Sequence, residues 1–342
     1  MRIFAADQLR GIGEKMLQAS GAPEDEAATV ADLLVEANLR GQDGHGILML
    51  QRYLADIKSG RTVFPAEIEI VSDSDSSALI NGNRGFGQVI GEKAMELAIN
   101  KARGHTIGLV GAFNCNHIGM LAHYTMMALK QNMIGITICN SSPEVALYGG
   151  KARKLGTNPL SIAIPRALGK ENPIVLDMAT SVVAAGKIRT KYAKGEKLPE
   201  GWIIDEEGRP TVDPSVFVSR KGMLLPIGGY KGYGLSVIID SICGALTGTG
   251  CSSTDFKFGN GVVMCAINIE SFTPIEVFKE RVDSQIRSIR DSPIAPNFNE
   301  ILMPGEPEFR TMEERTKNGI EIADYTWEAL KEAGKELGIT VE

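Results

Sequence analysis

Residues 88–140 read QVIGEKAMELAINKARGHTIGLVGAFNCNHIGMLAHYTMMALKQNMIGITICN. Two segments with helical apolar spacing alternate here with two short apolar runs, which predicts helix 88–103, strand 107–112, helix 120–130 and strand 134–140. Helices and strands that alternate at these lengths are typical of a sheet covered by helices. The stretch therefore predicts an α/β fold or a mixed α+β fold.

Three helices are predicted before this stretch, within the first 60 residues. Gly21 ends the first helix, and Pro23 begins the second with acidic residues in its first turn. The second helix stops at Gly41, and the third shows apolar residues at helical spacing up to Gly60. His45 therefore lies in the short turn between the second and third helices.

The rest of the chain adds strands and helices to the same sheet. Residues 233–246 read as a buried helix, and the charged tail after Gly305 reads as mostly helical. Short apolar runs bounded by turn residues predict further strands at 68–71, 78–80, 160–164, 174–177 and 262–269.

Composition excludes several classes of protein. The net charge is -6 and no long basic stripe occurs, which argues against nucleic acid as a partner. The five cysteines are widely spaced without a CxxC pair, which argues against disulfides and zinc and suits a reducing compartment. The N-terminus lacks a signal-type apolar core, and the longest apolar runs are strand-sized. We therefore expect a cytoplasmic protein with no membrane contact.

Two of the four histidines stand in glycine-rich turns. His45 lies in Asp43-Gly-His-Gly46, and His117 lies in the stretch NCNHIG, residues 114–119. Imidazole titrates near neutral pH, so both are candidates for proton transfer; that each only caps a helix stays the alternative. His105 reads as a surface turn residue, and His123 is expected to face solvent or packing.

Common nucleotide and catalytic motifs are missing. HExxH, GxSxG, the P-loop and the Rossmann GxGxxG do not occur, and no set of metal ligands is predicted. Turn-rich segments at 156–159, 177–181 and 227–234 nevertheless suit phosphate binding through backbone N–H groups. Lys231 stands among the glycines of the last segment and suits a pyrophosphate or a carboxylate; plain loop flexibility is the alternative reading.

These segments, in their order and spacing, resemble the second malate/L-lactate dehydrogenase family, which is unrelated to the Rossmann lactate dehydrogenases. Its members include ureidoglycolate dehydrogenase, diketogulonate reductase, sulfolactate dehydrogenase and a cyclic-imine reductase. The resemblance covers almost the whole chain, and each motif is short on its own. It is carried by residues 39–46, 116–119, 155–159, 177–181, 185–188, 199–202, 205–214 and 228–235.

The resemblance implies a non-Rossmann fold with a large central mixed sheet. A helical N-terminal part, residues 1–75, would be joined by C-terminal helices at 308–342, and residues 76–307 would form the central cofactor- and substrate-binding domain. Members are homodimers, so we expect a homodimer with the active site near the subunit interface.

The resemblance also implies roles for single residues. His45 matches a proton donor of some members and His117 an acid/base of others, so which one moves the proton stays open. Gly44, Met49 and Ser142 fall at substrate positions. Asp177 falls at a cofactor position, where its carboxylate would accept a hydrogen bond from a ribose hydroxyl. The cofactor positions are Ser141, Asp177, Met178, Ala179, Thr180, Lys231, Gly232, Gly305, Glu306 and Pro307.

Two substrate positions depart from the family. Most members have serine where this chain has Gly44, and many have arginine where it has Met49. Loss of a bidentate partner for a carboxylate weakens the case for a simple dicarboxylate such as malate.

The predicted activity is hydride transfer between NAD or NADP and a small 2-hydroxy acid or 2-oxo acid. An NAD(P)H-dependent reductase of cyclic imino acids is the first alternative. A degenerate member that binds a nucleotide without turnover is the second, and cofactor oxidation with a panel of substrates separates the three.

Overall fold

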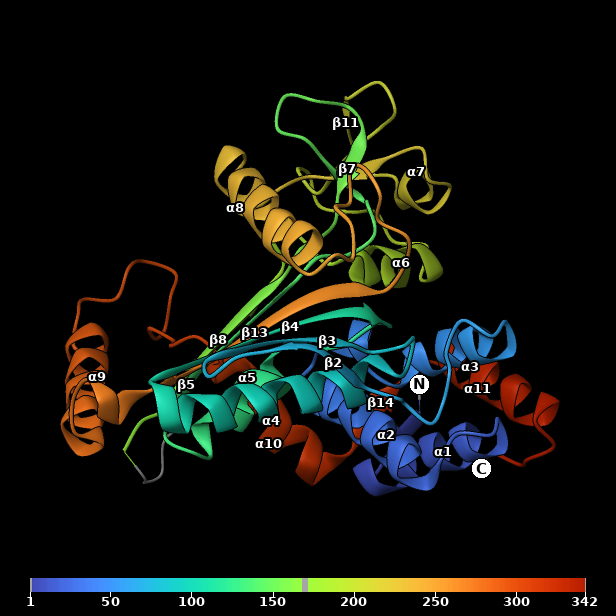
Figure 1. The fold of residues 1–342 in the computed structure, drawn as a ribbon. Helices are drawn as coiled ribbons and strands as arrows, with labels where there is room; N and C mark the ends of the chain where they lie inside the picture. The colour runs from blue at the N-terminus through green and yellow to red at the C-terminus, as the bar shows by residue number, and fades with distance from the viewer. Residues whose placement is uncertain (1, 168–171, 342) are drawn as a thin grey trace.

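The computed structural model describes residues 2–167 and 172–341 and contains a large mixed sheet crossed by helices (Figure 1). The strand order is β2-β3-β4-β13-β5-β8-β9, in which β3 and β4 run parallel and the other neighbours run antiparallel. The strands are β2 (Glu69–Asp73), β3 (Ser77–Asn81), β4 (Ile107–Cys115), β5 (Met133–Cys139), β8 (Leu160–Ile164), β9 (Ile174–Met178) and β13 (Asn260–Asn268).

Two helices, α4 (Gly87–His105) and α5 (Ala122–Leu129), pack on one face of this sheet (Figure 1). Glycine on the strands lets the helices approach closely, since a Cβ at Gly108 would overlap the carbonyl oxygen of Ala98 in α4. The core between the layers includes Ile90, Met95, Val110, Tyr124 and Met264.

The two ends of the chain build one helical part. Strand β1 (Arg2–Phe4) pairs antiparallel with β14 (Ile320–Ile322). Around this pair pack α1 (Ala6–Ala19), α2 (Glu24–Leu39), α3 (Leu50–Lys58), α10 (Glu306–Asn318) and α11 (Asp324–Glu336) (Figure 1). Their shared core contains Leu9, Met16, Leu34, Leu50, Trp327 and Leu330.

A second lobe stands above the large sheet in Figure 1. Its five short strands follow the order β11-β10-β12-β6-β7. They are β6 (Val145–Ala146), β7 (Arg153–Leu155), β10 (Ile203–Ile204), β11 (Pro210–Thr211) and β12 (Met223–Leu224). The lobe also contains α6 (Ala185–Ala193), α7 (Pro214–Val218) and α8 (Tyr230–Asp240), while α9 (Ile275–Arg290) lies at the far edge of the molecule.

The predicted mixed α/β fold and its central strands are confirmed. The helix predicted at 233–246 exists as α8 and a π-helical continuation, Ser241–Leu246, but its description as buried is wrong. Leu235, Ile238 and Leu246 are 38%, 57% and 66% exposed, respectively. The division into domains stays a prediction; β2, which lies before its boundary at 75, pairs with β3 in the central sheet.

Two features are absent from the described ranges. No helix there combines the length and the apolar character that a membrane crossing requires. Nor do three or more His, Cys, Asp or Glu side chains in those ranges gather in a way that would hold a metal ion.

Candidate functional site

The fold brings His45 and His117 face to face. His45 ends a short 3₁₀ helix, Asp43–His45, that follows α2, and His117 lies in the loop after β4. Their ring centroids are 5.4 Å apart and their planes differ by 10°, so the rings stack. The two turns that the sequence singled out therefore form one site, at the junction of the helical part and the large sheet.

Tyr53 and Gln88 orient the ring of His117. The side-chain nitrogen of Gln88 donates to the Tyr53 hydroxyl at 2.8 Å, and that hydroxyl lies 2.8 Å from Nδ1 of His117. Because Gln88 supplies the hydrogen of the first contact, the hydroxyl hydrogen of Tyr53 is available to Nδ1. Neutral His117 then carries its proton on Nε2, which has no hydrogen-bond partner among the described residues.

The environment favours the neutral form of both imidazoles. Burial, with the positive charge of Arg52, lowers the pKa of His45 to about 4. Burial, the neighbouring His45 and Arg52 together lower the pKa of His117 well below its usual value. Burial also raises the pKa of the Tyr53 hydroxyl, which keeps its proton. Nδ1 of His45 is buried and has no partner in the described part of the chain.

A clamp of three side chains fixes the turn that carries His45. Asn38 donates to Asp43 at 2.6 Å and accepts from the backbone N–H of Ile47 at 2.7 Å. Arg315, from helix α10, donates to both carboxylate oxygens of Asp43, at 2.7 and 3.1 Å. His45 lies between these two anchored positions, so both ends of the chain position it.

Three predicted cofactor residues lie along one polar seam. The Ser141 hydroxyl accepts from the N–H of Thr157 at 3.1 Å, and the N–H and hydroxyl of Thr180 each donate to the Thr157 carbonyl at 2.8 Å. The Thr180 carbonyl accepts from Ile227 at 2.9 Å, and a Cβ at Gly232 would lie 2.7 Å from that carbonyl. Ser141, Thr180 and Gly232 thus meet where β5, β9 and α8 converge.

The neighbours of this seam offer further contacts. Lys231 is exposed, and its ammonium group has no ion-pair or hydrogen-bond partner among the described residues. Ser142 is exposed, whereas Met178 and Ala179 are half-buried beside Thr180. A free ammonium group next to backbone that only glycine permits is suited to a phosphate group.

Asp177 is engaged within the protein. Its Oδ2 accepts from the backbone N–H of Ala122 at 2.8 Å, at the first residue of α5, and the side chain of Gln42 also bonds to it. Burial raises the pKa of Asp177 to about 6. The carboxylate therefore joins β9 to α5 and to the residues just before Asp43; the contact with a ribose hydroxyl stays a prediction.

The turn at 305–307 lies against β9. Gly305 has a φ of +93°, and a Cβ there would lie 2.9 Å from the Val175 carbonyl. The Glu306 carboxylate accepts from the N–H of Met303 at 2.7 Å and pairs with Arg290, and Pro307 is the second residue of α10. This turn is thereby held two residues before Asp177 on the same strand.

A model of malate/L-lactate dehydrogenases matches residues 4–331 of this chain. The chain belongs to the malate/L-lactate dehydrogenase family. A malate dehydrogenase of Pyrococcus abyssi is 43% identical over 97% of this chain and 94% of its own length. An L-sulfolactate dehydrogenase of Methanocaldococcus jannaschii is 42% identical over 96% and 95%. The crystal structure of a malate dehydrogenase from Entamoeba histolytica is 29% identical, with a TM-score of 0.92 over 99% of this chain and 98% of that one.

The two departures from the family pattern have different surroundings. A Cβ at Gly44 would lie 3.7 Å from the Gly186 Cα in α6, an ordinary contact, so packing does not forbid a serine there. Met49 is half-buried and packs against the core of the helical part. The helix that begins after Met49 also carries Arg52 and Tyr53.

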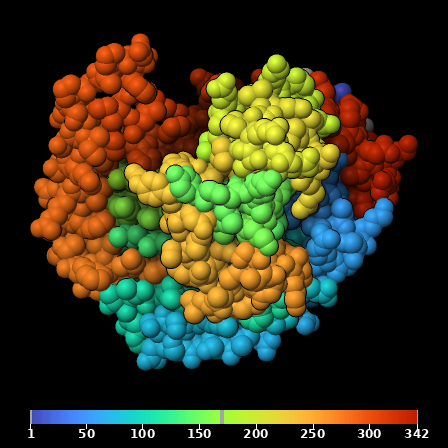
Figure 2. All heavy atoms as spheres, turned by 90° about the horizontal axis from the view of Figure 1, so that it is seen from above, coloured from blue at the N-terminus to red at the C-terminus, as the bar shows by residue number. Residues whose placement is uncertain are grey.

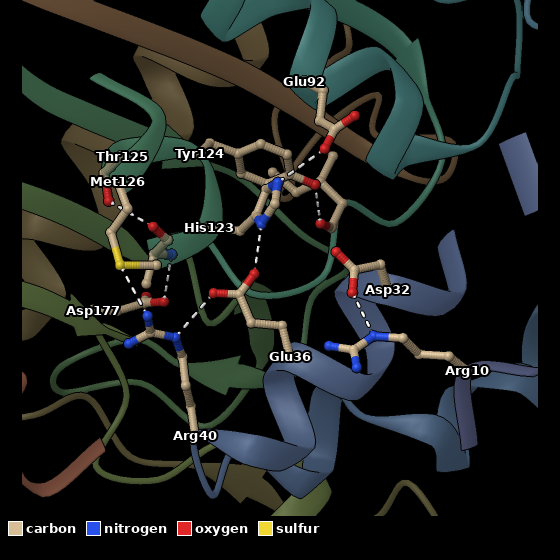
Figure 3. Close-up of polar contacts among 12 residues, drawn as sticks. Arg10, Asp32, Glu36, Arg40, Glu92, His123, Tyr124, Thr125, Met126 and Asp177 are labelled. Atoms are coloured by element: carbon tan, nitrogen blue, oxygen red, sulfur yellow. Dashed lines mark hydrogen bonds and ion pairs between the residues drawn. The ribbon is translucent and has the colours of Figure 1, made fainter. Parts of the chain in front are cut away.

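His123 is packed inside the protein, which is one of its two predicted environments, but it also forms ion pairs that were not predicted. Its ring lies edge-on to that of Tyr124, with centroids 5.3 Å apart, while Nδ1 lies 2.6 Å from Glu36 and Nε2 lies 3.0 Å from Glu92 (Figure 3). Burial disfavours the charged ring, but the hydrogen bonds to the two carboxylates outweigh it and raise the pKa of His123 to about 9. Arg40 binds Glu36 from the other side at 3.0 Å. This charged cluster joins α2, α4 and α5.

Sequence reasoning missed Tyr53, Gln88, Asn38 and Arg315. A tyrosine or glutamine within a helix has the same sequence pattern whether its side chain packs in the core or forms a hydrogen bond with a catalytic group. One signal existed for Tyr53, since residues 49, 52 and 53 share a helix face by their spacing.

Proposed function

We propose that this protein is a NAD(P)-dependent dehydrogenase that interconverts a small 2-hydroxy acid and its 2-oxo acid. The observation that carries the proposal is the stacked histidine pair, in which Tyr53 fixes His117 and leaves Nε2 free. When bound, the nicotinamide exchanges a hydride with C2 of the substrate. The balance is one 2-oxo acid, one NAD(P)H and one proton for one 2-hydroxy acid and one NAD(P)⁺.

His117 is our choice for the residue that moves the proton. Tyr53 orients the ring of His117 and leaves the proton on Nε2, whereas no hydrogen bond of the His45 ring occurs among the described residues. An anionic substrate next to the rings would favour the imidazolium form and raise the low pKa of His117. The proton taken up with the substrate then passes from Nε2 to the C2 oxygen, while His45 forms the wall behind His117.

The polar seam fits the cofactor. Ser141, Thr180 and Gly232 supply hydroxyl and backbone groups at a close approach of the chain, and Lys231 supplies a free positive charge. In our proposal Met178, Ala179 and the turn at 305–307 flank the bound cofactor. Both NAD and NADP remain candidates, so each is tested.

We also propose a cytoplasmic homodimer. Exposed apolar side chains support a subunit interface. Among them are Ile238 in α8, Leu246 at the end of its π-helical continuation, and Phe298 after α9. Figure 2 shows a hollow between the segment around α9, in deep orange, and the yellow lobe. Light scattering on an active sample tests the assembly, and a fully active monomer would reject it.

One assay tests the function and its alternatives. NADH and NADPH oxidation is followed by absorbance with oxaloacetate, pyruvate, sulfopyruvate and a cyclic imino acid. We expect turnover with a 2-oxo acid. Turnover of the imino acid alone would favour the reductase, and cofactor binding without any turnover would favour the degenerate member.

A further inference from the structure

A 2-oxo acid carries a carboxylate on the carbon next to the reacting one, so its site needs a cation near the histidines. Position 49, which the resemblance to the family places at the substrate, carries the uncharged Met49. Three other cationic side chains are less suited to this role, because two are already paired and one lies in the polar seam. Arg40 is bound by Glu36 and lies over the ring of Phe309, and Arg315 is bound by Asp43 (Figure 3 shows Arg40). Lys231 belongs to the polar seam at α8.

Arg52 is placed differently. It lies on α3 three residues after position 49, and residues at this spacing share a helix face. It directly precedes Tyr53, whose hydroxyl binds His117. Within the described residues, it is the cation whose charge acts on both stacked imidazoles.

The guanidinium of Arg52 keeps its hydrogen-bond donors available for a ligand. It forms a salt bridge with Asp56 at 3.7 Å, which is longer than a hydrogen bond, and no hydrogen bond of its guanidinium occurs in residues 2–167 and 172–341. Arg61 binds the same Asp56 at 2.7 Å and so neutralises that carboxylate. Arg52 is 52% exposed, which leaves it accessible to a small anion.

We infer that Arg52 is the substrate-binding residue that holds the carboxylate next to the reacting carbon. Met49 then contacts the other end of the substrate and favours an uncharged substituent there. The inference rests on the proposed function and adds to it the group that selects 2-oxo acids over neutral ketones.

The test compares Arg52→Met, Arg52→Lys and the control Arg61→Met. Arg61 contacts the same Asp56 and is 53% exposed, but its charge does not act on the histidines. Arg52→Met should raise the KM for pyruvate by about 10- to 100-fold, the effect of one charge-assisted contact, with a smaller change in kcat. Arg52→Lys should recover part of the loss, and Arg61→Met should keep the wild-type KM.

Oxamate gives a readout without turnover, because this 2-oxo acid analogue cannot be reduced. Its affinity for the enzyme with NADH or NADPH, measured by calorimetry, should fall by the same factor in Arg52→Met. The uncharged oxamide should bind both proteins equally. Thermal melting verifies that each variant is folded, and Arg52→Lys serves as the test if Arg52→Met is not.

Unchanged oxamate affinity in a folded Arg52→Met protein overturns the inference. An equal loss of oxamate affinity in Arg61→Met also overturns the inference, because the effect would then come from the Asp56 carboxylate that both arginines contact. If the wild-type enzyme reduces no 2-oxo acid but binds oxamate through Arg52, the proposed function fails, while Arg52 remains the residue that binds a carboxylate at this site.

Discussion

The cluster around His123 predicts a stability that depends on pH. The folded protein raises the pKa of His123 from 6.5 to about 9, and a pKa difference of one corresponds to about 1.4 kcal/mol. The charged ring therefore contributes about 3 kcal/mol to the free energy of unfolding. The His123 and Glu36 side chains are each 15% exposed, so solvent screening is weak. The lowered pKa of Glu36 reflects the same contact and adds nothing to this value.

The contribution of the charged ring is largest at low pH. A group whose pKa is raised on folding contributes its full stability below the unfolded pKa, here about 6.5. The contribution disappears as the pH rises through about 9. His123→Gln should therefore reduce the free energy of unfolding most at pH 6, and the difference from wild type should shrink by about 3 kcal/mol by pH 10.

Urea unfolding at pH 6, 8 and 10 measures this difference, and His105→Gln is the control because His105 is exposed at the end of α4. Titration of groups that do not contact His123 occurs in both proteins and cancels from the comparison. A His123→Gln difference that stays constant from pH 6 to pH 10 would refute a charged His123 in the cluster.

Three other predictions concern the site. His117→Gln should lower kcat by about 10²- to 10⁴-fold with little change in cofactor affinity, and near wild-type turnover would reject His117 as the proton carrier. Lys231→Met should weaken NAD(P)H binding by about 10- to 100-fold, measured by nicotinamide fluorescence, and equal affinity would remove Lys231 from the cofactor site. Arg315→Gln should lower kcat several-fold and shift the pH profile because the turn of His45 loosens. Arg310→Gln should do neither, because Arg310, on the same helix as Arg315, only forms a surface pair with Glu300. Identical profiles for the two arginine variants would show that the clamp does not position His45.

The sequence predicted the parts of the fold that have strong periodicity. In β5, buried and half-buried residues alternate along the strand, and α4 is a long helix with one buried face, so both follow from their patterns. The second lobe did not follow, because its strands have two or three residues and give no periodic signal. The exposed side of α8 was not predicted either. Apolar residues in a sequence indicate burial, but they do not show whether another part of the same chain covers them.

The site was predictable where chemistry and loop composition coincide. Histidine in a glycine-rich turn pointed to His45 and His117, which the fold does bring together. The partners that orient them come from distant positions, such as Arg315, 272 residues after Asp43. For His123 the deciding neighbours, Glu36 and Glu92, lie 87 and 31 residues away, so no local pattern revealed an ion pair.

The pairing of β1 with β14 has a consequence for synthesis on the ribosome. The chain emerges from its N-terminus, so α1, α2 and α3 appear early, while Trp327 and Leu330, which complete their core, emerge after the strands of the large sheet. The large sheet needs neither of these residues and can form in the meantime. The turn of His45 also depends on Arg315, so the nascent enzyme should acquire its acid/base geometry only after α10 has left the exit tunnel.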